Sequence, residues 1–141
     1  MSNDMSLFFA DAIEQVEAVP FVVSDRIKDK EKKPVEWLLR PISEDQNDVI
    51  RKSATRKNKG KNGMQLPEVD SSEYVAKLVA ACVVYPNLND AELQRSYGVR
   101  GADVVVRKML LSGEYAALCE KVQEINGFDK DVNELADEVK N

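Results

Sequence analysis

The segment PVEWLLRPISEDQ, residues 34–46, constrains the fold more than any other part of the chain. It predicts a β-strand over residues 35–40, because side chains alternate between the two faces of a strand and one face here is entirely apolar. We expect this face to pack against helices. Pro41 ends the strand, since proline cannot donate a hydrogen bond to a sheet ladder. The residues of the apolar face are Val35, Trp37 and Leu39.

A second run on the N-terminal side gives this strand a partner. Residues 18–24, AVPFVVS, are rich in β-branched and aromatic residues, and Pro20 suits an edge position. With the polar connection between the two runs, residues 18–41 predict a β-hairpin. A lone hairpin is marginal in water, so we expect it to lean on helices or to pair with another chain through its exposed edges.

Helical signals account for much of the remaining chain. Residues 4–17 have apolar positions at helical spacing, which predicts an amphipathic helix that packs on the body or binds a partner. Ser43 begins a capping box, and the helix that follows has Val49 and Ile50 as its strong apolar anchors. Capping residues and apolar stripes predict a helical body over residues 70–139.

Together these elements predict a single α+β domain over residues 1–141. It is mainly α, with a small N-terminal β-hairpin packed on a bundle of about five to six helices. The length of 141 residues is enough to bury a real core. No apolar run approaches the roughly 20 residues of a membrane span, and the N-terminus lacks the features of a secretory signal. We therefore expect an intracellular protein.

The residue types argue against catalysis. The chain contains no histidine, which removes Ser-His-Asp and Cys-His catalytic sets and imidazole-ligated zinc. Cys82 and Cys119 lie among apolar neighbours at helical spacing, which favours reduced core residues over a disulfide or a metal site. The carboxylates lie at predicted helix starts or on polar faces, where they favour the helix dipole. We therefore expect no enzyme activity, no catalytic residues, no metal and no cofactor.

Residues 51–64 are unusual in charge. They include six basic residues and no acid, while the whole chain has a net charge of −5. Glycines in this segment break regular structure, so it predicts a flexible basic loop. The loop is open to three interpretations: a solvated loop, a loop that orders on an acidic protein partner, and a nucleic-acid site. The acidic net charge and the lack of interleaved aromatic residues make nucleic acid the weakest of the three.

Three segments together resemble a known family: residues 34–46, KMLLSGEYAAL at residues 108–118, and VQEINGF at residues 122–128. They resemble the XkdN-like tail assembly chaperones, which are encoded in the tail-gene clusters of tailed phages and defective prophages. The similarity spans about residues 18–130. It implies a non-enzymatic protein that acts in the cytoplasm of the bacterial host, binds the tape-measure and tail-tube proteins, and is absent from the mature particle.

A chaperone of this kind needs apolar surface that binds reversibly. The alternative function is a small nucleic-acid-associated regulatory protein that uses the basic loop. A homo-oligomer is a further expectation, because the positive loop and the negative C-terminal region of two copies would attract each other. No membrane contact is expected. The candidate partner-binding residues are Phe8, Phe9 and Ile13 in the first helix, Phe21 and Val23 at the hairpin edge, Trp37, which also suits a core position, and Arg56, Lys57 and Lys59 in the loop.

Overall fold

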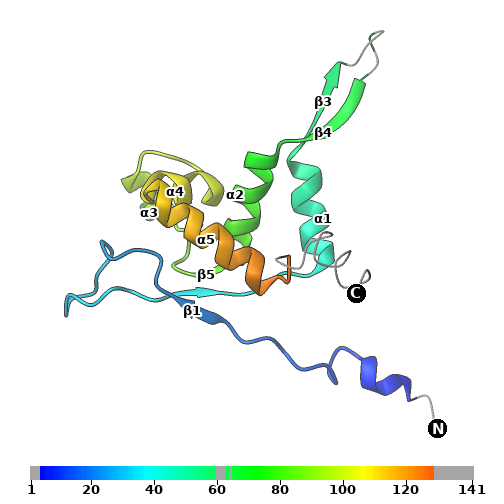
Figure 1. Cartoon of the computed structure of the whole chain (residues 1–141), viewed down its shortest axis with the longest axis horizontal. Coiled ribbons are helices and arrows are strands. Elements are labelled where there is room, and N and C mark those ends of the chain that lie inside the picture. Colours follow the sequence, from blue (N-terminus) through cyan, green and yellow to red (C-terminus); the bar gives the residue numbers. More distant parts are fainter. Residues whose placement is uncertain (1–3, 60–62, 64, 129–141) are drawn as a thin grey trace, which may run out of the picture.

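The computed structural model describes residues 4–59, 63 and 65–128 of the protein. Within these ranges the chain forms five α-helices, one 3-10 turn and two small antiparallel sheets, so the predicted α+β class is confirmed (Figure 1). In chain order the elements are η1 (Met5–Phe8), β1 (Val19–Phe21), β2 (Trp37–Leu39), α1 (Glu44–Ser53), β3 (Thr55–Lys59), β4 (Gln65–Val69), α2 (Ser71–Cys82), β5 (Val83–Tyr85), α3 (Ala91–Ser96), α4 (Ala102–Met109) and α5 (Ser112–Ile125).

The first sheet has three strands in the order β1-β2-β5. The predicted hairpin is present, with β1 antiparallel to β2 and Phe21 opposite Trp37. The other edge of β2 is covered by β5, whose residues the sequence predicted to be part of the helical body. Helix α2 ends at Cys82 instead, because the β-branched residues Val83 and Val84 favour a strand and β2 offers an edge to pair with. The N-terminal β element is therefore a sheet closed by a distant segment rather than an isolated hairpin.

The core lies between the inner face of this sheet and helices α2, α4 and α5. The predicted alternation along β2 is confirmed, since Trp37 and Leu39 are 1% and 0% exposed while Arg40 is exposed. Burying a side chain of this size contributes about 1.5–3 kcal/mol. The buried residues that complete this core from the three helices are Leu78, Val79, Cys82, Val105, Val106, Leu118 and Val122.

Helix α1 begins at the predicted capping box. The Ser43 hydroxyl accepts a hydrogen bond from the Gln46 N–H at 3.3 Å, and the Gln46 side chain accepts one from the Ser43 N–H at 3.0 Å. The prediction that Val49 anchors this helix is wrong, because its side chain is 67% exposed. The buried residue of this helix is Asn47, whose Oδ1 accepts a hydrogen bond from the Tyr74 hydroxyl of α2 at 2.5 Å. Helix α1 is thus held by a polar contact that an apolar stripe does not reveal.

Residues 51–64 correct the prediction of a flexible basic loop. Their first residues finish α1, and Thr55–Lys59 then pair along their full length with Gln65–Val69. The polar sequence of β3 has little strand propensity, so its strand conformation depends on the partner strand β4. Residues 60–62 and 64, between the two strands, lie outside the described residues. Figure 1 shows this two-stranded ribbon projecting away from the helices, and we call β3–β4 the basic ribbon.

Residues 4–17 correct a second prediction. The structure has only the 3-10 turn η1 there, followed by turns and then by residues 14–18 without regular structure. An isolated helix of this length is marginal in water unless its apolar face packs on something, and the apolar side chains of this segment are exposed. Figure 1 shows this segment extending away from the body. We call residues 4–18 the N-terminal arm.

The helical body begins at the predicted cap. Its predicted end, residue 139, lies outside the described part of the chain. Asp70 caps α2 through a 3.1 Å bond from the Glu73 N–H, and Asp90 caps α3 in the same way. Gly101 has a φ of +106° immediately before α4, a backbone conformation that side-chain-bearing residues rarely adopt. The last helix predicted from sequence begins at Asp129 and so lies outside the described residues.

Candidate interaction surface

The N-terminal arm presents the largest run of exposed apolar side chains. Phe8 is 69% exposed, Phe9 56% and Ile13 54%, so three of the predicted contact residues are accessible to a partner. The arm is ordered locally: the Asp4 carboxylate accepts a hydrogen bond from the Ser6 N–H, and bonds from Ser6 lower the pKa of Asp4. Other apolar side chains of the arm are exposed to a similar degree; they are Met5, Leu7 and Val16.

Three other predicted contact residues lie in or against the core. Val23 and Trp37 are 6% and 1% exposed, so they are core residues and do not belong to an accessible surface. Phe21 is half-buried and packs against the core, with the Lys121 ammonium 5.9 Å from its ring centroid. Periodicity identified these residues as apolar strand positions. It gives no burial for Phe21 and Val23, because the covered face of residues 18–24 depends on helices far away in the sequence.

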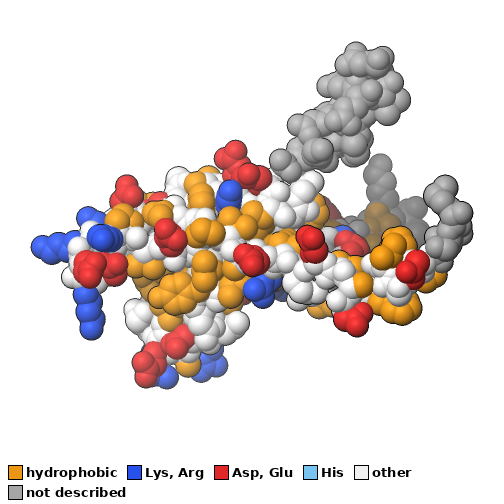
Figure 2. All heavy atoms as spheres, turned by 90° about the horizontal axis from the view of Figure 1, so that it is seen from below, with side chains coloured by type: hydrophobic (Ala, Val, Ile, Leu, Met, Phe, Trp, Pro, Cys, Tyr) orange, Lys and Arg blue, Asp and Glu red, His pale blue; other side chains and the backbone are white. Residues whose placement is uncertain are grey.

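The outer face of the three-stranded sheet is a second apolar surface. Strand residues that alternate with the buried ones point away from the core, and several of them are large and apolar. Figure 2 views the molecule from the side on which the sheet lies in Figure 1, and shows hydrophobic side chains interspersed with charged ones along that side. The exposed or half-buried apolar residues of this sheet and its flank are Pro20, Val22, Leu38, Val84 and Tyr85.

The cations predicted as a binding cluster differ in their surroundings. Arg56 forms an ion pair with Glu73 of α2, and the bonds from Lys77 and Arg56 lower the pKa of Glu73. Lys57 is exposed and forms no ion pair with another described residue. The side chain of Lys59 lies outside the described part of the chain. Since Arg56 is paired internally, the ribbon offers a phosphate backbone less positive charge than its sequence suggests.

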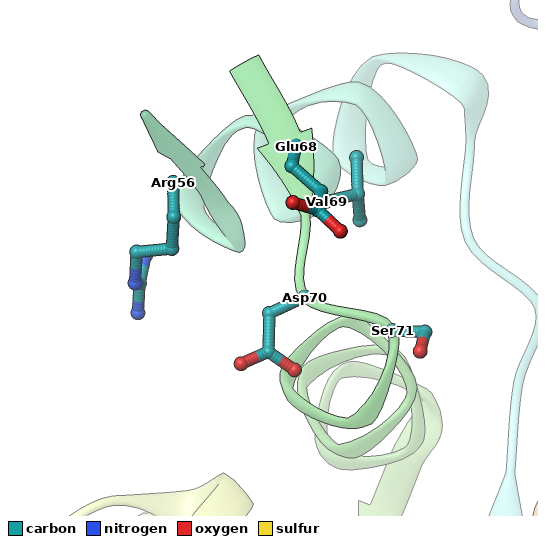
Figure 3. Close-up of a pocket in the computed structure, with 5 residues that line it drawn as sticks. All are labelled: Arg56, Glu68, Val69, Asp70 and Ser71. Carbon is teal, nitrogen blue, oxygen red and sulfur yellow. The ribbon is translucent and has the colours of Figure 1, made fainter. Parts of the chain in front are cut away.

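A shallow hollow marks the base of the basic ribbon (Figure 3). Arg56 comes from β3, Glu68 and Val69 come from β4, and Asp70 and Ser71 open α2. The Asp70 carboxylate is occupied as the cap of α2, and the Asp70 N–H donates to the Ala54 carbonyl at 2.8 Å. These bonds join the ribbon to the helix, which accounts for the polar lining without a ligand.

A polar cluster fixes the connection between β1 and β2 onto the junction of α4 and α5. Arg26 Nη2 donates to Glu114 Oε1 at 2.6 Å and to the Met109 carbonyl at 3.2 Å. The hydroxyl of the buried Ser24 donates to the other Glu114 oxygen. Hydrogen bonds from Arg26, Ser24 and the Leu111 N–H lower the pKa of Glu114 to about 2. The sequence did not indicate this cluster, because its members are far apart in the chain.

The part of the chain that the structure describes contains no cluster of side chains that could hold a metal ion. No set of three or more Cys, Asp or Glu side chains there is placed to hold a metal ion. Cys82 and Cys119 are free thiols, and burial raises the pKa of both. None of the described helices has the length and apolar character needed to cross a bilayer.

The fold and these surfaces define a small helix-rich α+β protein whose distinctive features are an exposed apolar arm and a projecting ribbon. The family model for the phage XkdN-like tail assembly chaperone protein matches residues 5–140. The chain therefore belongs to the XkdN-like tail assembly chaperone family, and the resemblance noted from its sequence is confirmed.

Two relatives from Bacillus subtilis (strain 168) match nearly the whole chain. The uncharacterized protein YqbN is 32% identical over 139 residues, covering 98% of this chain and 93% of YqbN. The phage-like element PBSX protein XkdN is 28% identical over 139 residues, covering 98% of this chain and 94% of XkdN. The crystal structure of YqbN superposes with a TM-score of 0.76, at 28% identity, over 90% of this chain and 98% of that one.

Proposed function

We propose that this protein is a non-enzymatic tail assembly chaperone. It binds the tape-measure and tail-tube proteins during tail morphogenesis in the cytoplasm of the bacterial host, and it leaves before the particle is complete. Membership of the tail assembly chaperone family supports this role. The observation that carries the mode of action is the N-terminal arm, whose large apolar side chains are not covered by the protein's own body.

The composition of the arm suits reversible binding. Covering Phe8 or Phe9 with a partner's apolar surface would contribute about 1.5–3 kcal/mol for each ring, before the cost of ordering the arm is subtracted. The acids of the arm flank these rings on both sides and keep it hydrated when it is free. A partner with apolar helical segments would therefore be held and then released when polymerising subunits compete for the same segments.

The test is co-expression with the tape-measure protein from the same gene cluster, followed by co-purification. We expect the wild-type chain to keep that protein soluble and to elute with it, whereas Phe8→Ser together with Phe9→Ser removes the complex. Val49→Ser is the matched control, because Val49 is an equally exposed apolar residue on α1. Failure of the wild-type chain to form a complex, or equal binding by the double-serine variant, would contradict the proposal.

A further inference from the structure

The basic ribbon has one open edge and one blunted edge. The Asp70 N–H donates to the Ala54 carbonyl. Ala54 and Asp70 are therefore a directly opposite pair of the kind that exchanges backbone hydrogen bonds. Facing pairs in an antiparallel ladder alternate between bonded and non-bonded, so Lys57 and Pro67 form a non-bonded pair whose backbone groups point outward. Pro67 has no N–H, so the outer edge of β4 lacks a donor there. The outer edge of β3 keeps both backbone groups of Lys57.

Charge along this open edge has a defined sign. Residues 51–67 contain no acid, and neighbouring residues of a strand point to opposite faces, so Arg56 and Lys57 place a cation on each face of β3. Arg56 is held by Glu73, while Lys57 is exposed and has no acidic partner among the residues that the structure describes. A two-stranded ribbon that projects into solvent is marginal alone and gains stability from a third strand. The strand that fits this edge is extended and acidic.

The N-terminal arm has this character. It contains four acids and neither lysine nor arginine between residues 4 and 18. Residues 14–18 lie outside every helix and strand of the described chain, and both Glu14 and Glu17 are exposed. If this segment is extended, Glu14 and Glu17 point to opposite faces, because three positions separate them. One carboxylate then lies on the face of Lys57, and the other lies on the face of Arg56, which Glu73 already pairs.

Residues 14–18 of the arm cannot pair along the ribbon of their own chain. Glu17 is two residues before Val19, which is paired with Leu39, so it stays within roughly 7 Å of the sheet. The arm also borders Arg40–Ser43 at the start of α1, while the ribbon begins after the end of that helix. A helix of this length measures roughly 15 Å. The complementary arm must therefore come from another molecule.

We propose that the N-terminal arm of one copy adds to the open edge of β3 in a second copy, so that the protein associates with itself through an acidic arm and a basic ribbon. Each copy carries both halves of the contact, so two copies can exchange arms reciprocally or many can join head to tail. The contact uses residues 14–18, whereas the proposed function uses Phe8 and Phe9. The two proposals can therefore fail separately.

Sedimentation velocity of the full chain over a wide concentration range tests the association. We expect concentration-dependent association at low salt that weakens as salt screens the charges. Glu14→Lys alone and Lys57→Glu alone should each be monomeric, because residues 14 and 57 then carry charges of the same sign. An equimolar mixture of the two variants should associate again. Lys108→Glu, the same charge change on α4, should behave like the wild type. A wild-type chain that stays monomeric, or a mixture that does not associate, would overturn the proposal.

A backbone variant tests the added strand itself. Lys57→Gln removes one exposed ion pair and should weaken association about two- to fivefold. Lys57→Pro also removes the outward N–H, and we expect a further loss of at least about tenfold. The ribbon should survive, since Pro67 is already accommodated directly opposite. Circular dichroism and the denaturation midpoint confirm that both variants are folded. Equal association by the glutamine and proline variants would exclude pairing at this edge.

Discussion

The contact between α1 and α2 makes a quantitative prediction about stability. Asn47 is 5% exposed; its Oδ1 accepts the Tyr74 hydroxyl at 2.5 Å, and its Nδ2 donates to Glu44 at 3.1 Å. A neutral hydrogen bond contributes about 1 kcal/mol net, but leaving a buried polar partner unsatisfied costs about 1–3 kcal/mol. We expect Asn47→Ala and Tyr74→Phe each to lower the free energy of unfolding by about 2 kcal/mol. The double variant should lose about 1 kcal/mol less than the sum, because the second substitution leaves no further partner unpaired.

Urea denaturation followed by tryptophan fluorescence measures these values, since Trp37 is the single tryptophan and is buried in the core. The matched control is Val49→Ala on the same helix, where an exposed side chain should change stability by less than about 0.5 kcal/mol. Additive losses, within about 0.5 kcal/mol, would show that the two side chains are not coupled and would refute the reasoning. A larger loss of unfolding free energy for Val49→Ala than for Asn47→Ala would support the apolar anchor that the sequence predicts.

Three further predictions concern ionisation and backbone conformation. The pKa of Glu114 is lowered to about 2 in the folded protein. This carboxylate therefore stabilises the fold fully at a pH above its unfolded pKa, and the stabilisation is lost as the pH falls through the folded pKa. Glu114→Gln should flatten the acid limb of a pH–stability curve measured by urea denaturation. Burial and the neighbouring Cys119 raise the pKa of Tyr115 to about 12, so a spectroscopic titration of tyrosinate should show one late ionisation that Tyr115→Phe removes, and stability should decline as the pH rises above about 10. Gly101→Ala should lower the unfolding free energy by more than about 1 kcal/mol, because a Cβ at φ +106° would also lie 3.1 Å from the Asp103 carboxylate, whereas Gly113→Ala, with open space around it, serves as the control.

Features that depend on near neighbours in the chain could be predicted from the sequence. The alternation that places Trp37 and Leu39 inward depends only on strand geometry, and the Ser43 capping box depends only on four consecutive residues. The strand β5 could not be predicted in the same way. Its residues continue the apolar pattern of α2, and the edge that draws them into the sheet is formed by residues more than forty positions earlier.

The basic ribbon shows a different limit. Six cations in a segment with glycines at positions 60 and 63 look like a loop, and only the threonine of TRKNK favours a strand by itself. The hydrogen bond from Asp70 to Ala54 closes the base of the ribbon and sets the register that pairs Arg56 with Glu68. A signal for this pairing was present, since QLPEV carries leucine and valine immediately before a helix cap. It was too short to distinguish from a connection.

The N-terminal arm explains why one part of the surface was predicted although its secondary structure was not. The same apolar residues that predict an amphipathic helix lose their reason to be helical when no surface covers them, because a short helix gains most of its stability from packing. Phe8 and Phe9 therefore remain exposed, which is the property that made them candidate contacts. Local periodicity identifies residues that need a partner, but it does not say whether that partner is the chain's own core or another molecule. In Trp37 the core supplies it, and in the arm the described structure leaves the need unmet.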